Sequence, residues 1–336
     1  MRAVILGDDG QECFADIPEP TPAPGEVIVE IAYCGVCGSD LHAEHQGFRH
    51  GVALGHEFSG RIIETGTGGV ADFVVGDRVC INPNGDWCGS CGLCRAGQYN
   101  LCANLFQASI GVSRHGGMAR YVAVPAKVLH RLPDGVTTKQ GAWVEPLATA
   151  LRGVRKSGIA MGDSAFVFGG GPIGLLVIAL LRSMGAGHIT TFEPGPGRAA
   201  MASRLGADDV LNPFNIDLTE IYPDPATAPA YGFECSGVAA ATESALQLLR
   251  PSGILTVTGI APKLSHYQAT DLVFKETTIQ GSFIYDEEFA MAIDLLDRGV
   301  IDIEPLTSEI RSMNGGLQAF ADLRQADQLI KVLLTP

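Results

Sequence analysis

The sequence predicts a two-domain α/β protein in which the second domain is built on a doubly wound parallel sheet. A chain of 336 residues, 46% of them hydrophobic and 18% charged, is long enough for about two compact domains. Glycine and proline break roughly the first 150 residues into short apolar runs, which is typical of a β-rich domain. From about Asp163, apolar strands alternate with amphipathic helices, and this alternation indicates parallel βαβ units.

Individual elements can be placed from these patterns. Within the β-rich part, strands are expected at Val27–Val29 and Tyr121–Val124. The alternating prolines between Pro18 and Gly25 favour a stiff surface connection over a flexible linker. In the second part, a helix should follow Pro172, and six strands would complete the sheet. The strands expected there are 165–168, 188–192, 232–234, 254–257 and 277–279, and the further helices are 199–205 and 242–249.

The C-terminal tail departs from this alternation. After Gly281 no further strand follows at the earlier spacing, and residues 287–296 are expected to form a separate helix. We therefore expect the tail to pack back on the first domain. This gives a catalytic domain of residues 1–146 and 283–336, and a nucleotide-binding domain of residues 147–282.

Charge and hydropathy exclude several classes of partner. The net charge of −14, from 37 acidic and 23 basic residues, opposes binding to nucleic acid or to anionic membranes. The apolar run near Met1 is shorter than the roughly 7 to 15 residues of a signal peptide, and Ile173–Leu181 is far below the roughly 20 that span a bilayer. Nine cysteines, four of them crowded together, are typical of metal thiolates in a reducing compartment. A soluble cytoplasmic metalloprotein is expected.

Four cysteines on a glycine-rich loop form the most specific local motif. Their spacing is Cys-x2-Cys-x2-Cys-x7-Cys, at Cys88, Cys91, Cys94 and Cys102. Four thiolates can close a tetrahedral shell around zinc and leave no open coordination position, so the loop is interpreted as a structural zinc site. An iron–sulfur cluster, a pair of disulfides and a nucleic-acid-binding zinc ribbon are the alternatives.

A second set of metal-ligating side chains lies upstream. Cys37, His56 and Glu57 offer a thiolate, an imidazole and a carboxylate, a mixture typical of catalytic zinc sites that keep a fourth position for water or substrate. A buried cysteine on its own is usually just a small hydrophobe, and Cys34 and Cys80 are interpreted in that way. Cys37 and His56 are interpreted as ligands because they occur together with the four-cysteine loop and the nucleotide motif described next.

A glycine-rich turn predicts a dinucleotide site. The motif Gly169-x-Gly171-x-x-Gly174 directly follows an expected strand, and Pro172 and Ile173 open the following helix. Such a turn lets the backbone approach a pyrophosphate, which then binds the free N–H groups of the helix N-terminus. A glycine-rich turn without a ligand is the alternative interpretation.

Glu193 extends this motif. It ends the next expected strand, about 20 residues after the glycines, where a carboxylate accepts hydrogen bonds from the adenosine ribose. Because a carboxylate repels a 2′-phosphate, NAD is favoured over NADP. Arg198 lies nearby in sequence and keeps NADP as the less favoured alternative.

Taken together, these motifs resemble those of the zinc-containing medium-chain alcohol dehydrogenases, particularly the sorbitol, butanediol and threonine dehydrogenase branch of the medium-chain dehydrogenase/reductase superfamily. The resemblance runs nearly end to end. Further matching segments are Gly116–Val122, Glu145–Ala148, Glu234–Gly237 and Gly281–Phe283. The resemblance implies a GroES-like catalytic domain, a Rossmann domain that binds NAD, one catalytic and one structural zinc per chain, and a homodimer or homotetramer.

The resemblance also implies the ligands of the catalytic zinc. Cys37 and His56 would hold the metal, and either Glu57 or Glu145 would supply a carboxylate. Other alcohol dehydrogenases carry a cysteine at the position of Glu145, whereas polyol-type members carry glutamate and let water complete the shell. In this respect the sequence is similar to the polyol type.

Further roles follow from the same resemblance. Ser39 and His42 would form a proton relay from the substrate hydroxyl towards solvent, and Asp40 would support the geometry of the zinc ligands. The residues expected at the cofactor are Gly169, Gly171, Pro172, Ile173, Gly174, Glu193, Arg198, Cys235, Ile260 and Phe283.

The predicted reaction is hydride transfer between NAD and a secondary alcohol, diol or cyclic polyol, with the substrate alkoxide bound to the catalytic zinc. A zinc ion makes this alkoxide accessible at neutral pH because it lowers the pKa of a bound hydroxyl. Sorbitol-like members contact polyol hydroxyls through the arginine of a Phe-Arg-Tyr segment, whereas this sequence has Ile284 there. Isoleucine cannot donate a hydrogen bond. A less hydroxylated substrate is therefore expected, unless Tyr285, Glu44 or His45 supplies the polar contact.

Two other functions fit parts of the sequence. A zinc-free quinone or enoyl reductase of the same superfamily would share the nucleotide site but lack Cys37, His56, Glu57 and the four-cysteine loop. A non-catalytic NAD-binding protein would not need Ser39 and His42. The acidic chain also disfavours a zinc-ribbon protein that binds nucleic acid.

Overall fold

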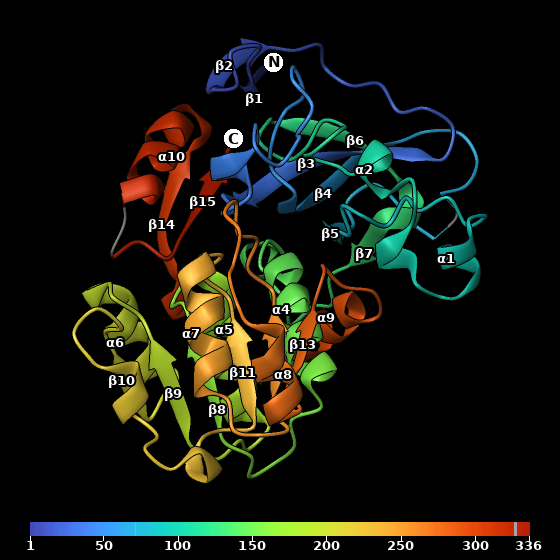
Figure 1. Ribbon diagram of the computed structural model, residues 1–336. Coiled ribbons are helices and arrows are strands. Elements are labelled where there is room, and N and C mark those ends of the chain that lie inside the picture. The colour runs from blue at the N-terminus through green and yellow to red at the C-terminus, as the bar shows by residue number, and fades with distance from the viewer. Residues whose placement is uncertain (71, 326–327) are drawn as a thin grey trace. The chain divides into compact units, whose positions relative to one another are not determined.

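A computed structural model describes residues 1–70, 72–325 and 328–336 (Figure 1). The chain divides into two compact units: residues 1–145 with 289–336, and residues 146–288. Each unit has its own sheet and its own hydrophobic core. This confirms the expected fold class of a β-rich part followed by a doubly wound α/β part.

The first unit is built on a seven-stranded sheet. Its strands follow the order β14-β15-β3-β4-β5-β7, and β6 pairs with a further stretch of β3. The bounds are β3 (Glu26–Gly35), β4 (Glu57–Thr65), β5 (Arg78–Ile81), β6 (Tyr121–Pro125), β7 (Leu129–Arg131), β14 (Thr307–Ser312) and β15 (Lys331–Thr335). A separate hairpin pairs β1 (Arg2–Leu6) with β2 (Glu12–Asp16). Because β15 pairs antiparallel with the end of β3, the C-terminal tail belongs to the first unit's sheet.

Short helices fill the connections of the first unit. The α-helices are α1 (Gly92–Arg95), α2 (Leu105–Ala108), α3 (Thr138–Gly141) and α10 (Gly316–Gln325). The 3-10 helices are η1 (Asp40–His42), η2 (Tyr99–Leu101), η3 (Ala126–Val128), η6 (Glu304–Leu306) and η7 (Met313–Gly315). Two longer helices, α4 (Val144–Ser157) and α9 (Glu288–Asp297), begin at the residues where the chain passes from one unit to the other.

The second unit contains a six-stranded, all-parallel sheet in the order β10-β9-β8-β11-β12-β13. The bounds are β8 (Ala165–Phe168), β9 (Ile189–Phe192), β10 (Asp209–Leu211), β11 (Tyr231–Glu234), β12 (Ile254–Val257) and β13 (Thr278–Gly281). Numbered along the chain, this is the order 3-2-1-4-5-6 of a Rossmann sheet, with its switch point between β8 and β11. Ligands of such sheets bind at the carboxyl ends of the strands at this switch point.

The helices of this unit are α5 (Pro172–Ser183), α6 (Pro196–Arg204), α7 (Ala239–Leu248) and α8 (Ala269–Lys275), with the 3-10 helices η4 (Leu218–Glu220) and η5 (Pro225–Thr227). Figure 1 shows the longer helices running alongside the strands. The expected elements are present with ends that shift by a few residues. β10 was not among the expected strands, because Asp209–Leu211 is only three residues long and is nowhere fully buried. Among the described helices, none is both long and apolar enough to cross a membrane.

Residues 283–288 cluster with the second unit, although the sequence analysis assigned them to the first. Charge pairing on α4 explains this placement. Glu288 is 4% exposed and accepts hydrogen bonds from Arg152 at 3.1 Å and from Arg155 at 2.7 Å. These ion pairs hold the start of α9 against α4 and so extend the second unit to residue 288.

Candidate active site and metal clusters

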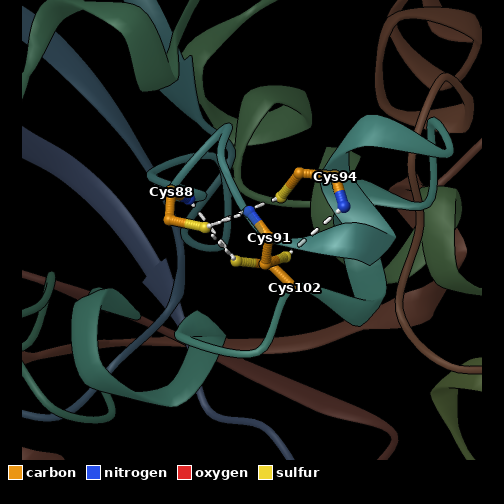
Figure 2. Close-up of side chains that lie close together, drawn as sticks. All are labelled: Cys88, Cys91, Cys94 and Cys102. Carbon is orange, nitrogen blue, oxygen red and sulfur yellow. Dashed lines mark hydrogen bonds between the residues drawn. The ribbon is translucent and has the colours of Figure 1, made fainter.

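The four-cysteine loop brings its sulfur atoms together (Figure 2). The ligand atoms of Cys88, Cys91, Cys94 and Cys102 all lie within 4.8 Å of one another. The Cys88 sulfur is 4.0 Å from that of Cys94 and 3.6 Å from that of Cys102. A tetrahedral shell with zinc–sulfur bonds of 2.3 Å places its sulfurs roughly 3.8 Å apart. The spacing of the four sulfurs therefore fits zinc, and all four cysteines are free thiols.

Backbone N–H groups donate to the sulfur atoms of this cluster and so favour their anionic form. The N–H groups of Cys91 and Asn104 each lie 3.4 Å from a cluster sulfur. Hydrogen bonds from the backbone of Ser90 and Cys91 lower the pKa of Cys88 to about 6, whereas burial raises the pKa of Cys94 to about 12. Four sulfur atoms this close together form a site that a divalent cation can complete, because metal binding displaces the protons of the thiols.

The second cluster is assembled by strand pairing. Cys37 follows the end of β3, and His56 directly precedes β4. Antiparallel pairing places Gly35 opposite Glu57, which brings the ends of the two segments together. As a result, the ligand atoms of Cys37, His56 and Glu57 lie within 4.8 Å of one another. This set keeps the mixed chemistry that the sequence predicted, with three donors rather than four.

Asp40 and Ser39 contact the imidazole of this cluster. One oxygen of Asp40, which is fully buried, accepts a hydrogen bond from the Cys37 N–H at 2.9 Å, and the other lies 3.5 Å from Nδ1 of His56. The hydroxyl of Ser39 lies 3.3 Å from Nε2 of His56. Burial lowers the pKa of His56, but Asp40 and Cys37 outweigh it and hold that pKa well above its usual value. His42, at the end of η1, is exposed.

Lys331 is a member of this site that sequence reasoning missed. Its side chain is 2% exposed, and its ammonium donates to both carboxylate oxygens of Glu57, at 2.8 and 2.6 Å. It also donates to the carbonyl oxygen of Val36 at 3.1 Å. Burial lowers the pKa of Lys331, but the charges of Glu57, Cys37 and Glu145 raise it, so the amine stays charged. Its place on the last strand, far from every motif, gave no local signal.

The two candidate carboxylates differ in their surroundings. Glu57 is 1% exposed, belongs to the donor cluster and is paired with Lys331. Glu145 is 8% exposed in the first turn of α4, and its charge acts on Lys331. Both carboxylates therefore lie in the field of one buried ammonium group. Cys34 and Cys80 are buried outside both clusters, as expected.

The glycine-rich turn lies at the switch point of the parallel sheet. Gly169 has a φ of +98°, which favours glycine, and Gly171 is the N-cap of α5 with Pro172 in the first helical turn. A side chain at Gly174 would overlap the carbonyl oxygen of Gly169, so only glycine fits the close approach of helix and turn. Ile173 follows in the first turn of α5. The N-cap Gly171 has no side chain to cap this helix, so the N–H groups of its first turn can bind an anion.

Glu193 follows β9 beside this turn. Its carboxylate accepts hydrogen bonds from the N–H groups of Gly170 at 2.5 Å and Gly195 at 2.7 Å, and the residue is 7% exposed. Arg198 lies half-buried on α6. The carboxylate therefore lies against the backbone of the glycine-rich loop, where the sequence motif predicts contact with a ribose.

The remaining predicted cofactor residues belong to later strands of the same unit. Cys235 directly follows β11, and Ile260, 58% exposed, follows β12. Phe283 follows β13 and is half-buried. The next residue, Ile284, has a φ of +42°, a conformation that a β-branched residue adopts only under strain. Tyr285 is 2% exposed, and Glu44 is paired with His50 at 2.9 Å.

These features define a class: a two-unit α/β oxidoreductase with a Rossmann sheet and two clusters of metal-ligating side chains. The model of the alcohol dehydrogenase GroES-like domain matches residues 23–134, and that of the zinc-binding dehydrogenase domain matches residues 172–298. The chain belongs to the zinc-containing medium-chain alcohol dehydrogenase family. It is an oxidoreductase that acts on CH–OH groups of small molecules, and the family expected from the sequence is confirmed.

Relatives match over almost their full length. The 2-dehydro-3-deoxy-L-galactonate 5-dehydrogenase of Pseudoalteromonas atlantica is 36% identical over 324 residues, which cover 93% of this chain and 92% of that protein. The (R,R)-butanediol dehydrogenase of Bacillus subtilis is 34% identical, with 95% of both chains covered. A zinc-binding dehydrogenase from Sinorhizobium meliloti, solved with NADP bound, superimposes with a TM-score of 0.93 at 33% identity and covers 100% of this chain and 99% of that one.

Proposed function

We propose that this dehydrogenase is zinc-dependent and transfers a hydride between the carbon of a secondary alcohol and NAD. The observation that carries this proposal is the mixed cluster of thiol, imidazole and carboxylate at the β3–β4 pair. Three different donors leave a coordination position for substrate, which a closed four-sulfur shell does not. The same chain has a dinucleotide loop at a sheet switch point, as hydride transfer to a nicotinamide requires.

In this proposal Cys37, His56 and Glu57 are the protein ligands of the catalytic zinc, with Glu145 as the alternative carboxylate. The fit rests on the donor set and on Asp40, which lies where a carboxylate orients a metal-bound imidazole. A zinc ion bound there supplies Lewis-acid polarisation of an alcohol or carbonyl oxygen. Zinc content distinguishes the carboxylates: E57Q should lose the catalytic metal while E145Q keeps it, and the reverse result would assign Glu145.

In this proposal, side chains around the cluster transfer the proton of the substrate hydroxyl to solvent. Ser39 lies 3.3 Å from the imidazole of His56 and would accept the proton of the substrate hydroxyl. His42 is exposed on the same short helix and would pass that proton to solvent. Asp40 fixes the backbone of Cys37 and the ring of His56, so it positions the ligands and does not contact substrate.

NAD is the proposed cofactor, and NADP is the alternative. Glu193 is buried against the glycine-rich loop, and its carboxylate would accept hydrogen bonds from ribose hydroxyls and repel a 2′-phosphate. The Sinorhizobium meliloti relative was solved with NADP bound, and Arg198 lies on α6 close in sequence to Glu193, so the two cofactors must be compared directly.

The proposed substrate is a secondary hydroxyl of a diol, a cyclic or linear polyol, or a sugar acid. One relative acts on a deoxy sugar acid and another on butanediol. In this chain Ile284 offers no hydrogen bond where sorbitol-like members have arginine, Tyr285 is buried, and Glu44 is engaged with His50. We therefore expect fewer polar contacts to substrate from this segment than in a sorbitol dehydrogenase.

An absorbance assay tests the proposal. Purified protein would be incubated with NAD or NADP and a panel of secondary alcohols, diols, polyols, sugar acids and L-threonine, and reduction followed at 340 nm. We expect NAD reduction with at least one hydroxylated substrate, abolished by a zinc chelator. Turnover that survives complete removal of zinc would instead support the zinc-free reductase. Cofactor binding without turnover across the panel would support a non-catalytic role.

We also propose that the protein forms a homodimer or homotetramer in the cytoplasm. Strand β12 is paired on both sides, with β11 and β13, so it has no free edge for a second copy. In the described part of the sheet the outer strands are β10 and β13, so only these can pair with a second copy. Light scattering of the purified protein measures the oligomeric state.

A further inference from the structure

Glu234, the last residue of β11, has a tightly held carboxylate outside the metal clusters. It is fully buried, and a single oxygen, Oε1, accepts three hydrogen bonds. The donors are the Ser236 N–H at 2.7 Å, the Ser236 hydroxyl at 2.5 Å and the Gly237 N–H at 3.0 Å. This carboxylate therefore fixes the turn that follows β11.

The backbone of the same residue holds the neighbouring turn. Its carbonyl oxygen accepts hydrogen bonds from the N–H groups of Thr258 at 2.9 Å and Gly259 at 3.0 Å, and from the Thr258 hydroxyl at 3.0 Å. A side chain at Gly259 would overlap both the Gly237 nitrogen and Oε2 of Glu234. The turns after β11 and β12 are thus packed backbone to backbone, with Glu234 between them.

The turn after β11 also contacts the glycine-rich loop. A Cβ atom at Gly169 would lie 2.9 Å from the nitrogen of Ser236, the same N–H group that donates to Glu234. Gly169 is the first glycine of the dinucleotide motif and lies across the switch point from β11. If the Ser236 turn shifted, its backbone would therefore press directly on the Gly169 loop, which approaches the cofactor.

The chemistry of this contact favours a carboxylate. Three donors converge on Oε1, while Oε2 is buried without a hydrogen-bond partner among the described residues. In the isosteric E234Q variant, the amide oxygen can accept the three donors only if the amide nitrogen occupies the position of Oε2, where no acceptor is described. In the opposite orientation of the amide, its NH2 group faces the three donors. Because a neutral amide oxygen accepts these three donors more weakly than a carboxylate, the first arrangement weakens the turn, and the second leaves the buried donors without an acceptor.

We propose that Glu234 is a positioning residue of the dinucleotide site, which holds the turns after β11 and β12 against the Gly169 loop without touching the cofactor. The inference rests on the proposed function, because it presupposes that NAD or NADP binds at this switch point. It extends that proposal by assigning a role to a residue that neither the metal clusters nor the glycine motif explains.

Titration of NADH fluorescence tests the inference. E234Q should bind NADH about tenfold more weakly, equivalent to about 1.4 kcal/mol, and KM for NAD should rise in parallel. We expect kcat at saturating NAD to stay within about threefold and the zinc content to stay unchanged. Asp271→Asn is the matched control, because it removes an exposed carboxylate from α8 of the same unit and should leave NADH affinity unchanged. Unchanged affinity in folded E234Q would overturn the inference.

A second variant covers the case in which E234Q does not fold. Ser236→Ala removes one donor to Oε1 and should weaken NADH binding about threefold, and unchanged affinity there would also overturn the inference. In a folded E234Q/S236A double variant, the effect should stay close to that of E234Q alone, because both changes break one contact. A loss equal to the product of the single effects would contradict it. Wild-type protein that binds neither NADH nor NADPH would instead refute the proposed function.

Discussion

The two cysteine-containing clusters of the first unit differ in how the chain assembles them. The four-cysteine cluster comes from one short loop, contains sulfur only and is stabilised by backbone N–H groups. The Cys37 cluster needs the pairing of β3 with β4, mixes three kinds of donor and has an ammonium group from β15 beside it. A uniform, closed donor set suits a structural metal, whereas a mixed, open set with charged neighbours suits chemistry.

Removal of Cys37 gives the largest expected effect on activity. In C37A the open cluster loses its thiolate, so zinc per chain should fall from two to one, and kcat/KM should fall about a thousandfold or more, equivalent to roughly 4 kcal/mol. Metal analysis and the 340 nm assay measure both. Cys13→Ala, a half-buried cysteine outside both clusters, is the control. Full activity in zinc-depleted C37A would show that the Cys37 cluster does not hold a catalytic zinc.

Removal of Cys91 should lower stability more than activity, which is the reverse of the effect expected for C37A. C91A breaks the closed shell, and since binding of a structural zinc contributes to folding, we expect the loss of one zinc and several kcal/mol of unfolding free energy. Folded molecules should keep the Cys37 zinc and most of their activity per bound zinc. Denaturant unfolding together with metal analysis measures this. A C91A protein as stable as C13A would show that the four-cysteine loop does not need its metal.

Replacement of Lys331 tests the electrostatic side of the comparison. In zinc-free K331M, compared with zinc-free wild type, the buried carboxylate of Glu57 loses both hydrogen bonds from the ammonium, and such unpaired buried charges cost about 3–5 kcal/mol. Urea unfolding should show this loss, and the double variant K331M/E57Q should recover much of it. Equal stability of K331M and wild type would mean that the ion pair is not part of the site. The four-cysteine loop should bind zinc normally in the wild type, in K331M and in K331M/E57Q.

Replacement of Glu193 should have the smallest effect. E193A removes the carboxylate that repels a 2′-phosphate, so the ratio of kcat/KM for NAD over NADP should fall about tenfold, equivalent to about 1.4 kcal/mol. Both zinc sites should be unaffected, because the change lies in the other unit. Cofactor kinetics with one substrate measure the ratio. A wild-type preference for NADP would contradict the assignment of NAD at the outset.

Sequence reasoning predicted what local patterns encode. The four-cysteine spacing and the glycine turn are continuous in the chain, and the apolar strands alternate with helices, so the doubly wound class of the second unit could be predicted from general rules. Lys331 and Glu234 could not be predicted in this way. Lys331 joins its site only through pairing with Glu57, which lies hundreds of residues earlier, and Glu234 matters only because the turn that it fixes packs against the Gly169 loop.

In the structure the chain returns to the first unit a few residues later than the end of the alternation indicates. Periodicity showed where the alternation stops, after Gly281, but the ion pairs of Glu288 with Arg152 and Arg155 carry the second unit further along the chain. Charge pairs between distant helices leave no periodic signal in the sequence. The short strand β10 was missed because it is three residues long.

The most direct test follows zinc and activity together during chelation. The purified enzyme should contain two zinc ions per chain, and a mild chelator should first remove the zinc of the Cys37 cluster, because three mixed protein donors leave a coordination position open whereas four thiolates close the shell. We predict that dehydrogenase activity falls in proportion to this first zinc, while the second zinc and the folded state, measured by circular dichroism, persist. Activity that remains after the first zinc is gone, or that falls only with the second, would contradict the assignment of the two clusters.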